Sequence, residues 1–502
     1  MHFLSFVVFS FLSTFPVHAA IPPKPVPPPS SAEAVAFSGQ STFQQLIDHK
    51  NPSLGTFSQR YWYNSEWWAG EGSPVVLFTP GEESADPFTG YLTNKTLTGR
   101  LALEIKGAVL MLEHRYWGDS SPYDDLTTEN LQHLTLENSI ADLTYFARNV
   151  KLAFDTNNSS NAQNAPWVFS GGSYSGALAA WTESTSPGTF WAYHASSAPV
   201  QGIYDFWQYF TPVQEGMPKN CSKDVSRVIE YIDNVQASGS ETQMQKLKDM
   251  FGLGELDHFD DFASALQNGP WLWQSNTFYT GYSDFYKFCD YVENVEQGSK
   301  RLPGPNGVGL KKALHGYAKW FRNEHLPGSC ANYGYWSDQN TTACYDTYNT
   351  SNPMFTDISV NNTIDRQWQW ILCNEPLFYW QDGAPSGVPT VVSRAVNAEY
   401  WQRQCALYFP EVNGHTYGSA NGKTVSTVNA WTKGWDLTKT NRLIWANGQF
   451  DPWRDSGVSS KYRPGGPLRS TASVPVNVIP GAQKIIDAEV AQIKAWVKEY
   501  YQ

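Results

Sequence analysis

A serine at the end of an apolar stretch is the residue in this sequence best placed to act as a nucleophile. Residues 167–169 are apolar and β-prone, and the sequence SGGSYSG follows directly. This order predicts a strand, a sharp turn with Ser173 at its corner, and then a helix. Such a turn holds the hydroxyl clear of the sheet and needs small neighbours, because strand and helix approach closely. Gly171, Gly172 and Gly176 meet that need, so the stretch predicts covalent acyl transfer.

The turn departs at one position from the G-x-S-x-G pattern of such corners. Ser175 stands where the last glycine is usual. Serine is nearly as small as glycine, so close packing remains possible. The alternative is that residues 171–176 form a glycine- and serine-rich turn that only connects a strand to a helix. The rest of the sequence has to decide between the two interpretations.

A carboxylate suited to orienting a catalytic base follows the strand expected at residues 442–446. An acyl-transferring serine needs a base to take its proton, a carboxylate to orient that base, and N–H donors for the developing oxyanion. Asp451 comes after the strand and an Asn-Gly turn, which predicts that it lies at the same sheet edge as Ser173. Asp455 is a near neighbour, and the alternative for Asp451 is a solvated aspartate in a turn.

Backbone N–H groups are the expected donors to the oxyanion. On the α/β-hydrolase pattern, one donor belongs to Tyr174 and the other to Gly81 or Glu82, in the loop after the strand expected at residues 74–79. This assignment rests on analogy with the fold, because backbone groups leave no signature in a sequence. Glu82 and Glu83 either line the cleft or are ordinary surface glutamates.

Four stretches of the chain resemble a known family of serine peptidases. They are GGSYSGAL at residues 171–178, FSQRY at 57–61, EHRYWG at 113–118 and NGQFDPW at 447–453. The family includes lysosomal Pro-Xaa carboxypeptidase, dipeptidyl peptidase II and the secreted fungal prolyl endoproteases, and the chain is most similar to the fungal branch. The resemblance runs from about residue 43 to residue 481. It implies Ser173 as nucleophile, Asp451 as the aspartate of a catalytic triad, and cleavage on the carboxyl side of proline.

The histidine of such a triad is missing from its expected place. The family carries it in a loop after the last strand, where this chain has VIPGAQK at residues 478–484 and then its terminal helix. None of the ten histidines, at positions 2, 18, 49, 114, 133, 194, 258, 315, 325 and 415, follows Asp451. His114 and His194 come near strand ends, but neither is expected to replace the base. Either the sequence omits a loop that the gene encodes, which the intact motifs favour, or the protein is a variant without its base.

An aromatic stretch in the middle of the chain predicts a pocket for proline. A proline ring offers no N–H to bind, so it is recognised by a tight, apolar and usually aromatic wall. The candidate substrate-binding residues are Trp370, Glu375, Phe378 and Trp380. The alternative is that these aromatic residues form the interior of an inserted domain.

The composition indicates a large globular protein, and the first residues indicate that it is secreted. With 502 residues, 41% of them hydrophobic, the chain can bury an extensive core. Residues 1–20 hold an apolar run followed by small residues, which predicts a signal peptide. No later run is long enough to span a bilayer. We therefore expect secretion, with a vacuolar or lysosome-like compartment as the alternative, and no membrane partner.

The net charge and the motifs of the chain limit the classes of partner and cofactor that we expect. The formal net charge is −12, whereas nucleic-acid binding is typical of basic surfaces, so no nucleic-acid partner is expected. The chain lacks C-x-x-C and H-x-x-x-H spacings, so neither a metal nor another cofactor is expected. The resemblance implies that its partners are proline-containing peptides or proteins.

The cysteines and sequons also fit a secreted protein. An even number of cysteines in such a chain favours three disulfides, whose pairing the sequence leaves open. They are Cys221, Cys289, Cys330, Cys344, Cys373 and Cys405. Candidate glycosylation sites are Asn94, Asn157, Asn158, Asn220, Asn340, Asn349 and Asn361.

The order of patterns predicts an α/β-hydrolase fold with a large, mainly helical, disulfide-bonded inserted cap domain. Strands are expected at residues 74–79, 108–114, 190–194, 442–446 and 474–479, and helices at 136–150 and 483–501. The expected parts are a signal peptide at 1–20, a proline-rich linker or pro-segment at 21–40, the first part of the hydrolase domain at 41–200, the cap at 201–425 and the second part at 426–502.

Two rival functions remain open at this point. One is an esterase or lipase on the same fold. The other is a catalytically impaired protein that binds peptides or glycans in the cleft. Whether a peptidase of this kind acts as an endopeptidase, a carboxypeptidase or a dipeptidyl peptidase depends on how the cap closes the cleft, which the sequence leaves open.

Overall fold

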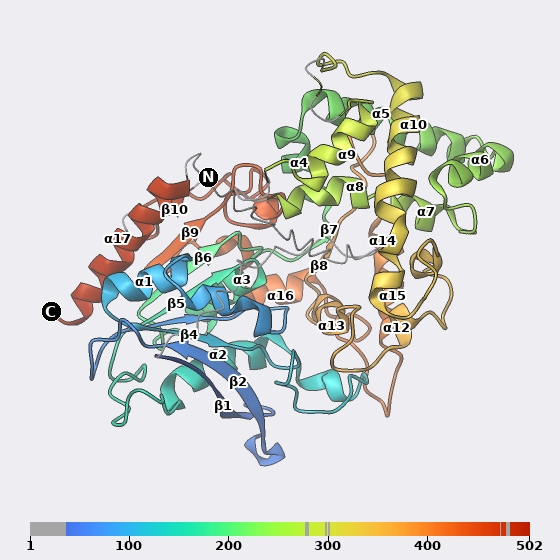
Figure 1. Ribbon diagram of the computed structural model, residues 1–502. Helices are drawn as coiled ribbons and strands as arrows, with labels where there is room; N and C mark the ends of the chain where they lie inside the picture. The colour runs from blue at the N-terminus through green and yellow to red at the C-terminus, as the bar shows by residue number, and fades with distance from the viewer. Residues whose placement is uncertain (1–36, 277–280, 297–298, 300–301, 472, 478–481) are drawn as a thin grey trace, which may run out of the picture.

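The described residues form an α/β body with a helical cap beside it (Figure 1). They were obtained as a computed structural model and comprise residues 37–276, 281–296, 299, 302–471, 473–477 and 482–502. The predicted signal peptide at 1–20 and most of the predicted linker at 21–40 lie outside them. The sheet already begins at Ser38, so the end of the expected linker belongs to the body.

One eight-stranded sheet forms the centre of the body, in the order β1-β2-β4-β3-β5-β6-β9-β10. Its strands are β1 (Ser38–Leu46), β2 (Thr56–Asn64), β3 (Val75–Phe78), β4 (Ala108–Leu112), β5 (Trp167–Gly172), β6 (Ala192–Ser196), β9 (Leu443–Ala446) and β10 (Val476–Asn477). The pairs β1/β2 and β2/β4 are antiparallel, and the remaining pairs are parallel. Every expected strand is present, although the last is short where it is described. The carboxyl ends of the parallel strands therefore meet at one edge.

Helices cover both faces of this sheet, as the buried parallel strands require. α2 (Leu136–Asn149) and α3 (Tyr174–Thr185) pack on one face, and α1 (Leu97–Ile105) and α17 (Ala482–Tyr500) pack on the other. The helices expected at 136–150 and 483–501 are confirmed as α2 and α17. Within the described part of the chain, no helix is long and apolar enough to cross a membrane. The strand order and the two helical layers are those of an α/β-hydrolase.

The cap is inserted between β6 and β9 and is mainly helical. Its helices are α4 (Phe210–Gly216), α5 (Lys219–Ala237), α6 (Glu241–Phe251), α7 (Phe259–Ala265), α8 (Asn268–Trp271), α9 (Asp284–Val292), α10 (Leu310–Trp320), α11 (Leu326–Ser329), α12 (Pro353–Thr356), α13 (Arg366–Asn374), α14 (Ala398–Gln402), α15 (Gln404–Tyr408) and α16 (Val425–Thr432). A short parallel pair, β7 (Ile203–Asp205) and β8 (Phe378–Trp380), joins distant parts of the insertion, and the sequence pattern did not predict it.

Three disulfides close loops within the cap, as expected. They join Cys221 to Cys289, Cys330 to Cys344, and Cys373 to Cys405. The first links α5 to α9 and the third links α13 to α15. Such cross-links stabilise a fold mainly by restricting the unfolded chain.

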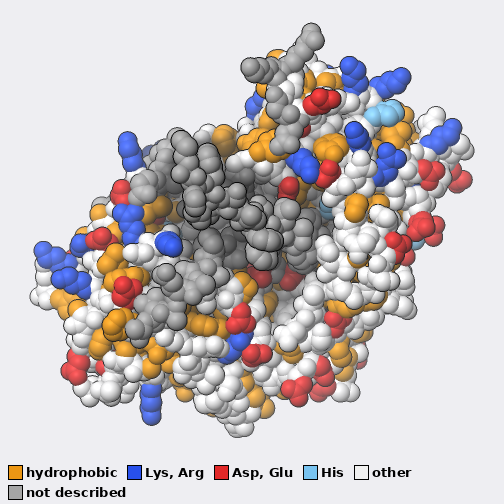
Figure 2. Space-filling view, in the orientation of Figure 1, with side chains coloured by type: hydrophobic (Ala, Val, Ile, Leu, Met, Phe, Trp, Pro, Cys, Tyr) orange, Lys and Arg blue, Asp and Glu red, His pale blue; other side chains and the backbone are white. Residues whose placement is uncertain are grey.

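The surface carries both signs of charge. On the face shown in Figure 2, basic and acidic side chains are interspersed over the body and the cap. This mixture of signs accompanies a formal net charge of −12.

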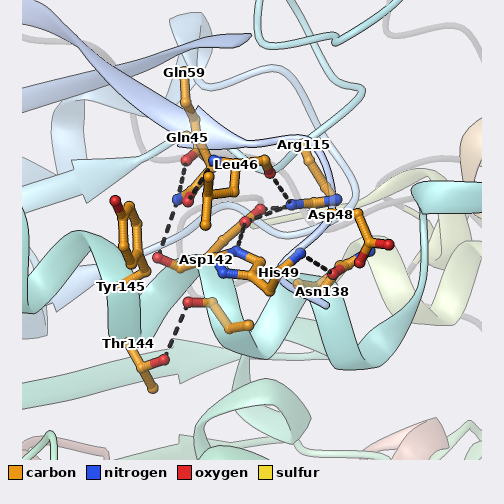
Figure 3. A network of polar contacts seen from close by, with 12 residues as sticks. Gln45, Leu46, Asp48, His49, Gln59, Arg115, Asn138, Asp142, Thr144 and Tyr145 are labelled. Atoms are coloured by element: carbon orange, nitrogen blue, oxygen red, sulfur yellow. Dashed lines mark hydrogen bonds and ion pairs between the residues drawn. The ribbon is translucent and has the colours of Figure 1, made fainter. Parts of the chain in front are cut away.

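A buried ion pair joins the segment after β4 to α2 (Figure 3). Arg115 lies just after β4, and its Nε is 2.7 Å from Oδ2 of Asp142 on α2. Nε2 of His49 lies 2.8 Å from the other carboxylate oxygen and donates to it when that nitrogen carries the proton. Arg115 also donates to the carbonyls of Ile47 and His133. Burial alone would raise the pKa of Asp142, but the charge and hydrogen bonds of Arg115, together with the interaction with His49, outweigh it and hold that pKa below its usual range.

Breaking this pair is expected to be costly. In Asp142→Ala the Arg115 guanidinium stays buried without its counter-ion, and such a loss typically costs about 3–5 kcal/mol of unfolding free energy. The matched control is Glu137→Ala, one turn earlier on α2, which removes an exposed ion pair with Lys50 worth about 1 kcal/mol or less. Urea denaturation of the two variants measures the difference. Equal losses of stability would contradict this account of the buried pair.

Buried carboxyl groups in the cap predict greater stability in acid. Burial, together with the nearby carboxylates of Asp205 and Glu399, raises the pKa of Asp382 to about 10. Burial likewise raises the pKa of Asp261 to about 6. Both acids are protonated in the folded protein at pH values where the unfolded chain has lost the proton. Their contribution to stability is therefore complete below about pH 4 and is lost as the pH rises through the folded-state pKa values.

The Asp382→Asn variant tests this pH dependence. Asparagine has the same shape as the protonated acid and does not ionise, so we expect a smaller loss of unfolding free energy between pH 4.5 and pH 8 than in the unmodified protein. The expected difference exceeds ~1.4 kcal/mol, the value of one pKa unit. Glu241→Gln, at an exposed position on α6, is the control. An unchanged pH dependence in Asp382→Asn would show that Asp382 is ionised in the fold.

Candidate active site

Ser173 occupies a strained corner between β5 and α3. Its φ is +56° and its ψ is −132°, a conformation that residues other than glycine rarely adopt. The Ser173 N–H donates to the carbonyl of Ser196 on β6 at 2.9 Å, which holds the corner against the neighbouring strand. Backbone strain of this kind persists only when the surrounding structure fixes it, and it is typical of functional positions.

Close packing around the corner explains its glycines. A Cβ atom added to Gly171 would lie 2.2 Å from the carbonyl oxygen of Ser175, and one added to Gly176 would lie 2.8 Å from the carbonyl oxygen of Ser196. Ser175 itself is only 1% exposed, so the serine that replaces the second glycine of the pattern fits the packed corner. The corner therefore has the geometry of a nucleophile elbow.

Asp451 follows β9 and caps the short helix at residues 452–456. Its Oδ1 accepts the N–H of Trp453 at 2.9 Å, and its Oδ2 accepts the hydroxyl of Ser197, the residue after β6. Burial raises the pKa of Asp451, and the hydrogen bond from Ser197 offsets this in part. The neighbouring Asp455 is fully buried against Arg454 at 3.2 Å. Of these two aspartates, Asp451 is the one that reaches the cavity described next.

Ser173 and Asp451 line the same cavity, which has a volume of about 810 Å³. It lies at the carboxyl ends of the strands and extends between the body and the cap. One wall is aromatic and comes from the cap and the Asp451 segment, with Trp273, Phe450 and Trp453. Further apolar lining comes from the end of β3, from residues 86–92 and from the start of α1, with Phe78, Phe88, Tyr91 and Leu97. A hydroxyl and a carboxylate thus share a mostly apolar enclosure, as acyl transfer requires.

The loop after β3 lies against the start of α3. Gly81 has φ +78°, and a Cβ added there would lie 3.4 Å from the backbone nitrogen of Ser175. Glu82 and Glu83 line the cavity. The Ser173 side chain accepts no hydrogen bond from the first turn of α3. The N–H groups at this end of the helix therefore give the corner a partial positive charge. This arrangement is compatible with the predicted oxyanion donors at Tyr174 and at Gly81 or Glu82, which remain a prediction.

Two of the resembling motifs position this loop. Glu113 is fully buried, and its carboxylate accepts from Arg60 Nε at 2.8 Å and Nη2 at 2.7 Å. The same carboxylate accepts the N–H of Ala85 at 2.9 Å, four residues after Gly81. A paired, buried carboxylate therefore fastens the loop to β4.

The histidines near the site are engaged elsewhere. His114 contacts the carbonyl of Arg115 through Nδ1 at 2.9 Å and the hydroxyl of Tyr174 through Nε2 at 3.2 Å, and burial lowers its pKa to about 4. His194 lines the cavity, with Nδ1 3.1 Å from Ser170 Oγ and Nε2 3.4 Å from Glu489 Oε2. His415 is exposed in the cap. Among the described residues, these three do not bridge Ser173 and Asp451.

The predicted substrate-binding residues lie inside the cap and not in this cavity, so that expectation requires correction. Trp370 is fully buried and donates to the carbonyl of Leu134 at 2.9 Å. Phe378 packs on Tyr204, and Trp380 stacks on Trp401. Glu375 is buried near Lys423 and lines a separate cavity of about 180 Å³. Their aromatic side chains pack in the interior of the cap, as the alternative interpretation held.

The aromatic wall beside Ser173 was missed. Phe450 and Trp453 flank Asp451 in the NGQFDPW stretch, so their position in the motif was an available signal. Trp273 comes from the cap, and its Nε1 donates to the carbonyl of Phe450 at 2.8 Å. No local pattern in the sequence links Trp273 to a segment 177 residues away.

The predicted glycosylation sites are mostly accessible. Asn94, Asn157, Asn158, Asn340, Asn349 and Asn361 are exposed, whereas Asn220 is half-buried on α5. Accessibility is necessary for modification, so Asn220 is the least suitable of the seven.

Comparison with known proteins identifies the family of this chain. Residues 44–465 match the family model described as serine carboxypeptidase S28. The chain is 42% identical to serine protease vicPb of Bipolaris victoriae, over 92% of this chain and 90% of that protein. It is 30% identical to a probable extracellular serine carboxypeptidase of Arthroderma benhamiae, over 83% of this chain and 59% of that protein. It is 26% identical to the human thymus-specific serine protease, over 85% of this chain and 78% of that protein. The chain therefore belongs to the serine carboxypeptidase S28 family and is a serine-type peptidase.

Proposed function

We propose that the protein is a secreted peptidase that cleaves on the carboxyl side of proline through an acyl-enzyme on Ser173. The observation that carries the proposal is the shared cavity, in which a strained serine and Asp451 face an aromatic wall. Trp273, Phe450 and Trp453 offer flat apolar surfaces, and shape is how a proline ring is recognised. Secretion is supported by the predicted signal peptide and by a relative named as extracellular.

The chemistry follows from the positions of the groups. Ser173 Oγ attacks the carbonyl carbon of the scissile peptide, and its proton passes to a base. The backbone N–H groups at the start of α3 and in the loop after β3 stabilise the oxyanion that forms. Asp451 orients the protonated base and stabilises its charge. The base then gives the proton to the leaving amine, and water later releases the acyl group from Ser173 by the same route.

In the resembling family a histidine after Asp451 supplies this base, and this chain has no histidine after Asp451. Loss of the base alone is expected to reduce turnover by a factor on the order of 10⁴ to 10⁶, because binding and oxyanion stabilisation remain. Slow single-turnover assays are therefore suited to this chain.

Matched peptides test the proposed specificity. Two peptides that differ only in proline or alanine before the scissile bond are incubated with the protein, and the products are identified by mass spectrometry. We expect cleavage after proline with kcat/KM at least ~10-fold higher than after alanine, because the aromatic wall favours the ring. Equal cleavage of the two peptides, or cleavage at other positions, would contradict the proposed specificity.

An esterase is the second candidate. Phe78, Phe88, Tyr91 and Leu97 line the same cavity as Ser173 and provide apolar surface for an acyl chain. Hydrolysis of p-nitrophenyl esters without cleavage of any proline peptide would favour this activity. A third possibility is a binding protein, which saturable binding of proline peptides without any turnover would support.

A further inference from the structure

A row of buried polar side chains lies beside the strand that carries Ser173. Ser170 on β5 and His194 on β6 are register partners, and the Ser170 hydroxyl oxygen lies 3.1 Å from Nδ1 of His194. On the other side of the ring, Nε2 of His194 lies 3.4 Å from Oε2 of Glu489 on α17. Each of these three residues is only 3% exposed. A hydroxyl, an imidazole and a carboxylate thus connect β5, β6 and α17.

These polar side chains lie on the face of the sheet opposite α3. Successive side chains of a strand point to opposite faces, and Val168 and Ala192, each two residues earlier, pack in the same cluster as the buried residues of α17. Ser170 and His194 therefore point toward α17. Gly171 faces α3, where an added Cβ atom would meet the backbone of that helix. Close backbone packing thus bounds the corner on one face and the polar row bounds it on the other.

β6 connects the polar row to the backbone of Ser173. Ser196, two residues after His194, accepts the N–H of Ser173 at 2.9 Å and is the register partner of Gly172. The positive φ of Ser173 is a strained conformation, and such strain persists only where the surroundings hold it. A contact that fixes β6 against β5 at His194 therefore also fixes the position of the Ser173 hydroxyl.

α17 is attached to the body by contacts other than that of Glu489. Ile493 and Val497 are buried in the cluster on this face, and the indole N–H of Trp191 donates to the carbonyl of Trp496 at 2.5 Å. Burial of a carboxylate is unfavourable, so attachment of the helix does not by itself explain Glu489. A carboxylate next to one ring nitrogen of a histidine sets which nitrogen carries the proton and how the ring is oriented.

We propose that His194 is a positioning residue for the nucleophile, oriented by Glu489 and holding Ser170. The inference rests on the proposed function, in which Ser173 is the nucleophile. The proton on Nε2 points toward Glu489, and Nδ1 accepts the hydroxyl of Ser170. The ring thereby fixes β6 against β5 where the corner begins. Because the effect passes through the backbone of Ser173, it changes the rate of the chemical step and not the binding of the reagent.

Ser170→Ala and Ser170→Thr form the most direct pair of variants. Alanine removes the hydroxyl, whereas threonine keeps it on a residue that suits a strand. Labelling of Ser173 by a fluorophosphonate is measured at increasing reagent concentration, which separates the maximal rate constant from the apparent affinity. We expect that constant to fall at least ~10-fold in Ser170→Ala with unchanged affinity, because a misplacement of about 1 Å can cost ~10²-fold. Ser170→Thr should stay within ~3-fold of the unmodified protein. Equal rates in the two variants would overturn the proposal.

His194→Phe and His325→Phe separate positioning from a loss of stability. Phenylalanine keeps a flat ring and removes both nitrogens. His325 is 6% exposed in the cap, and its Nε2 lies 2.8 Å from the hydroxyl of Tyr345, so its replacement removes a similar contact outside the cavity. Both variants should have a lower melting temperature, but well below it only His194→Phe should show a lower maximal labelling rate. An unchanged maximal rate in folded His194→Phe would overturn the proposal. If that variant does not fold, Ser170→Ala still provides the test.

Glu489→Gln tests whether the three side chains act as one unit. Glutamine keeps the shape of the side chain and removes its charge, so we expect a lower maximal labelling rate. Combining it with Ser170→Ala should lower the rate no further than Ser170→Ala alone, because both substitutions act through His194 and coupled effects are not additive. Effects that simply multiply would show that Ser170 and Glu489 act independently, which would contradict the proposal.

The inference and the proposed function fail in different ways. If the unmodified protein is not labelled at Ser173, the assignment of the nucleophile fails, and the positioning role fails with it. If Ser173 is labelled at one maximal rate in the unmodified protein, in Ser170→Ala and in His194→Phe, the nucleophile stands and only the positioning role is refuted.

Discussion

Replacing Ser173 with alanine is expected to abolish covalent labelling by a fluorophosphonate and all turnover of peptides. The substitution removes only the hydroxyl group, and the oxygen of that group is the atom that forms the acyl bond. The strained φ of +56° is retained by the backbone, so the fold itself should change little. Labelling is read by mass spectrometry of the intact protein, with circular dichroism to confirm folding.

Ser175→Ala is the matched control for this result. Ser175 lies two residues away in the same motif, is 1% exposed and does not line the cavity. Its replacement by another small residue should leave the labelling of Ser173 essentially intact. Undiminished labelling of Ser173→Ala would refute the assignment of the nucleophile, and loss of labelling in Ser175→Ala alone would do the same.

Gly171→Ala is expected to destroy the elbow although it adds only a methyl group. The new Cβ would lie 2.2 Å from the backbone carbonyl oxygen of Ser175, a distance that no rotamer can relieve. α3 must move away from β5, which displaces Ser173 and the N–H of Tyr174 together. Overpacking of this kind costs about 1–3 kcal/mol and occasionally more. We expect loss of labelling together with a lower melting temperature.

Gly172→Ala separates this steric effect from a general need for glycine in the turn. The nearest atom to a Cβ at residue 172 is the Ser196 carbonyl oxygen at 4.0 Å, which is ordinary contact distance or longer. This variant should therefore keep both its stability and its labelling. If the two adjacent variants behave alike, the close approach of α3 to residue 171 is not what shapes the corner.

The sequence predicted the body of the protein well because its signals are local. Strands such as β3 and β4 are continuous apolar runs, and α2 and α17 show helical spacing over several turns. Ser173 was recognised because the elbow needs small residues at fixed neighbouring positions. Asp451 was placed because the strand before it ends at the same edge of the sheet.

The binding surface was not predictable in the same way. Aromatic residues are frequent in the cap, and those around residues 368–380 pack in its interior because β8 pairs with β7 from a distant part of the chain. Trp273 lines the same cavity as Ser173 only because the cap folds back over the body. Long-range packing of this kind leaves no periodic signal in a single sequence.

The crystal structure of the protein inactivated by diisopropyl fluorophosphate tests the central claim most directly. The account predicts phosphorus bonded to Ser173 Oγ, a phosphoryl oxygen about 3 Å from the Tyr174 N–H, and the Asp451 carboxylate open to the same cavity. Phosphorus on another residue, or a phosphoryl oxygen directed away from the start of α3 with Asp451 shielded from the adduct, would contradict it.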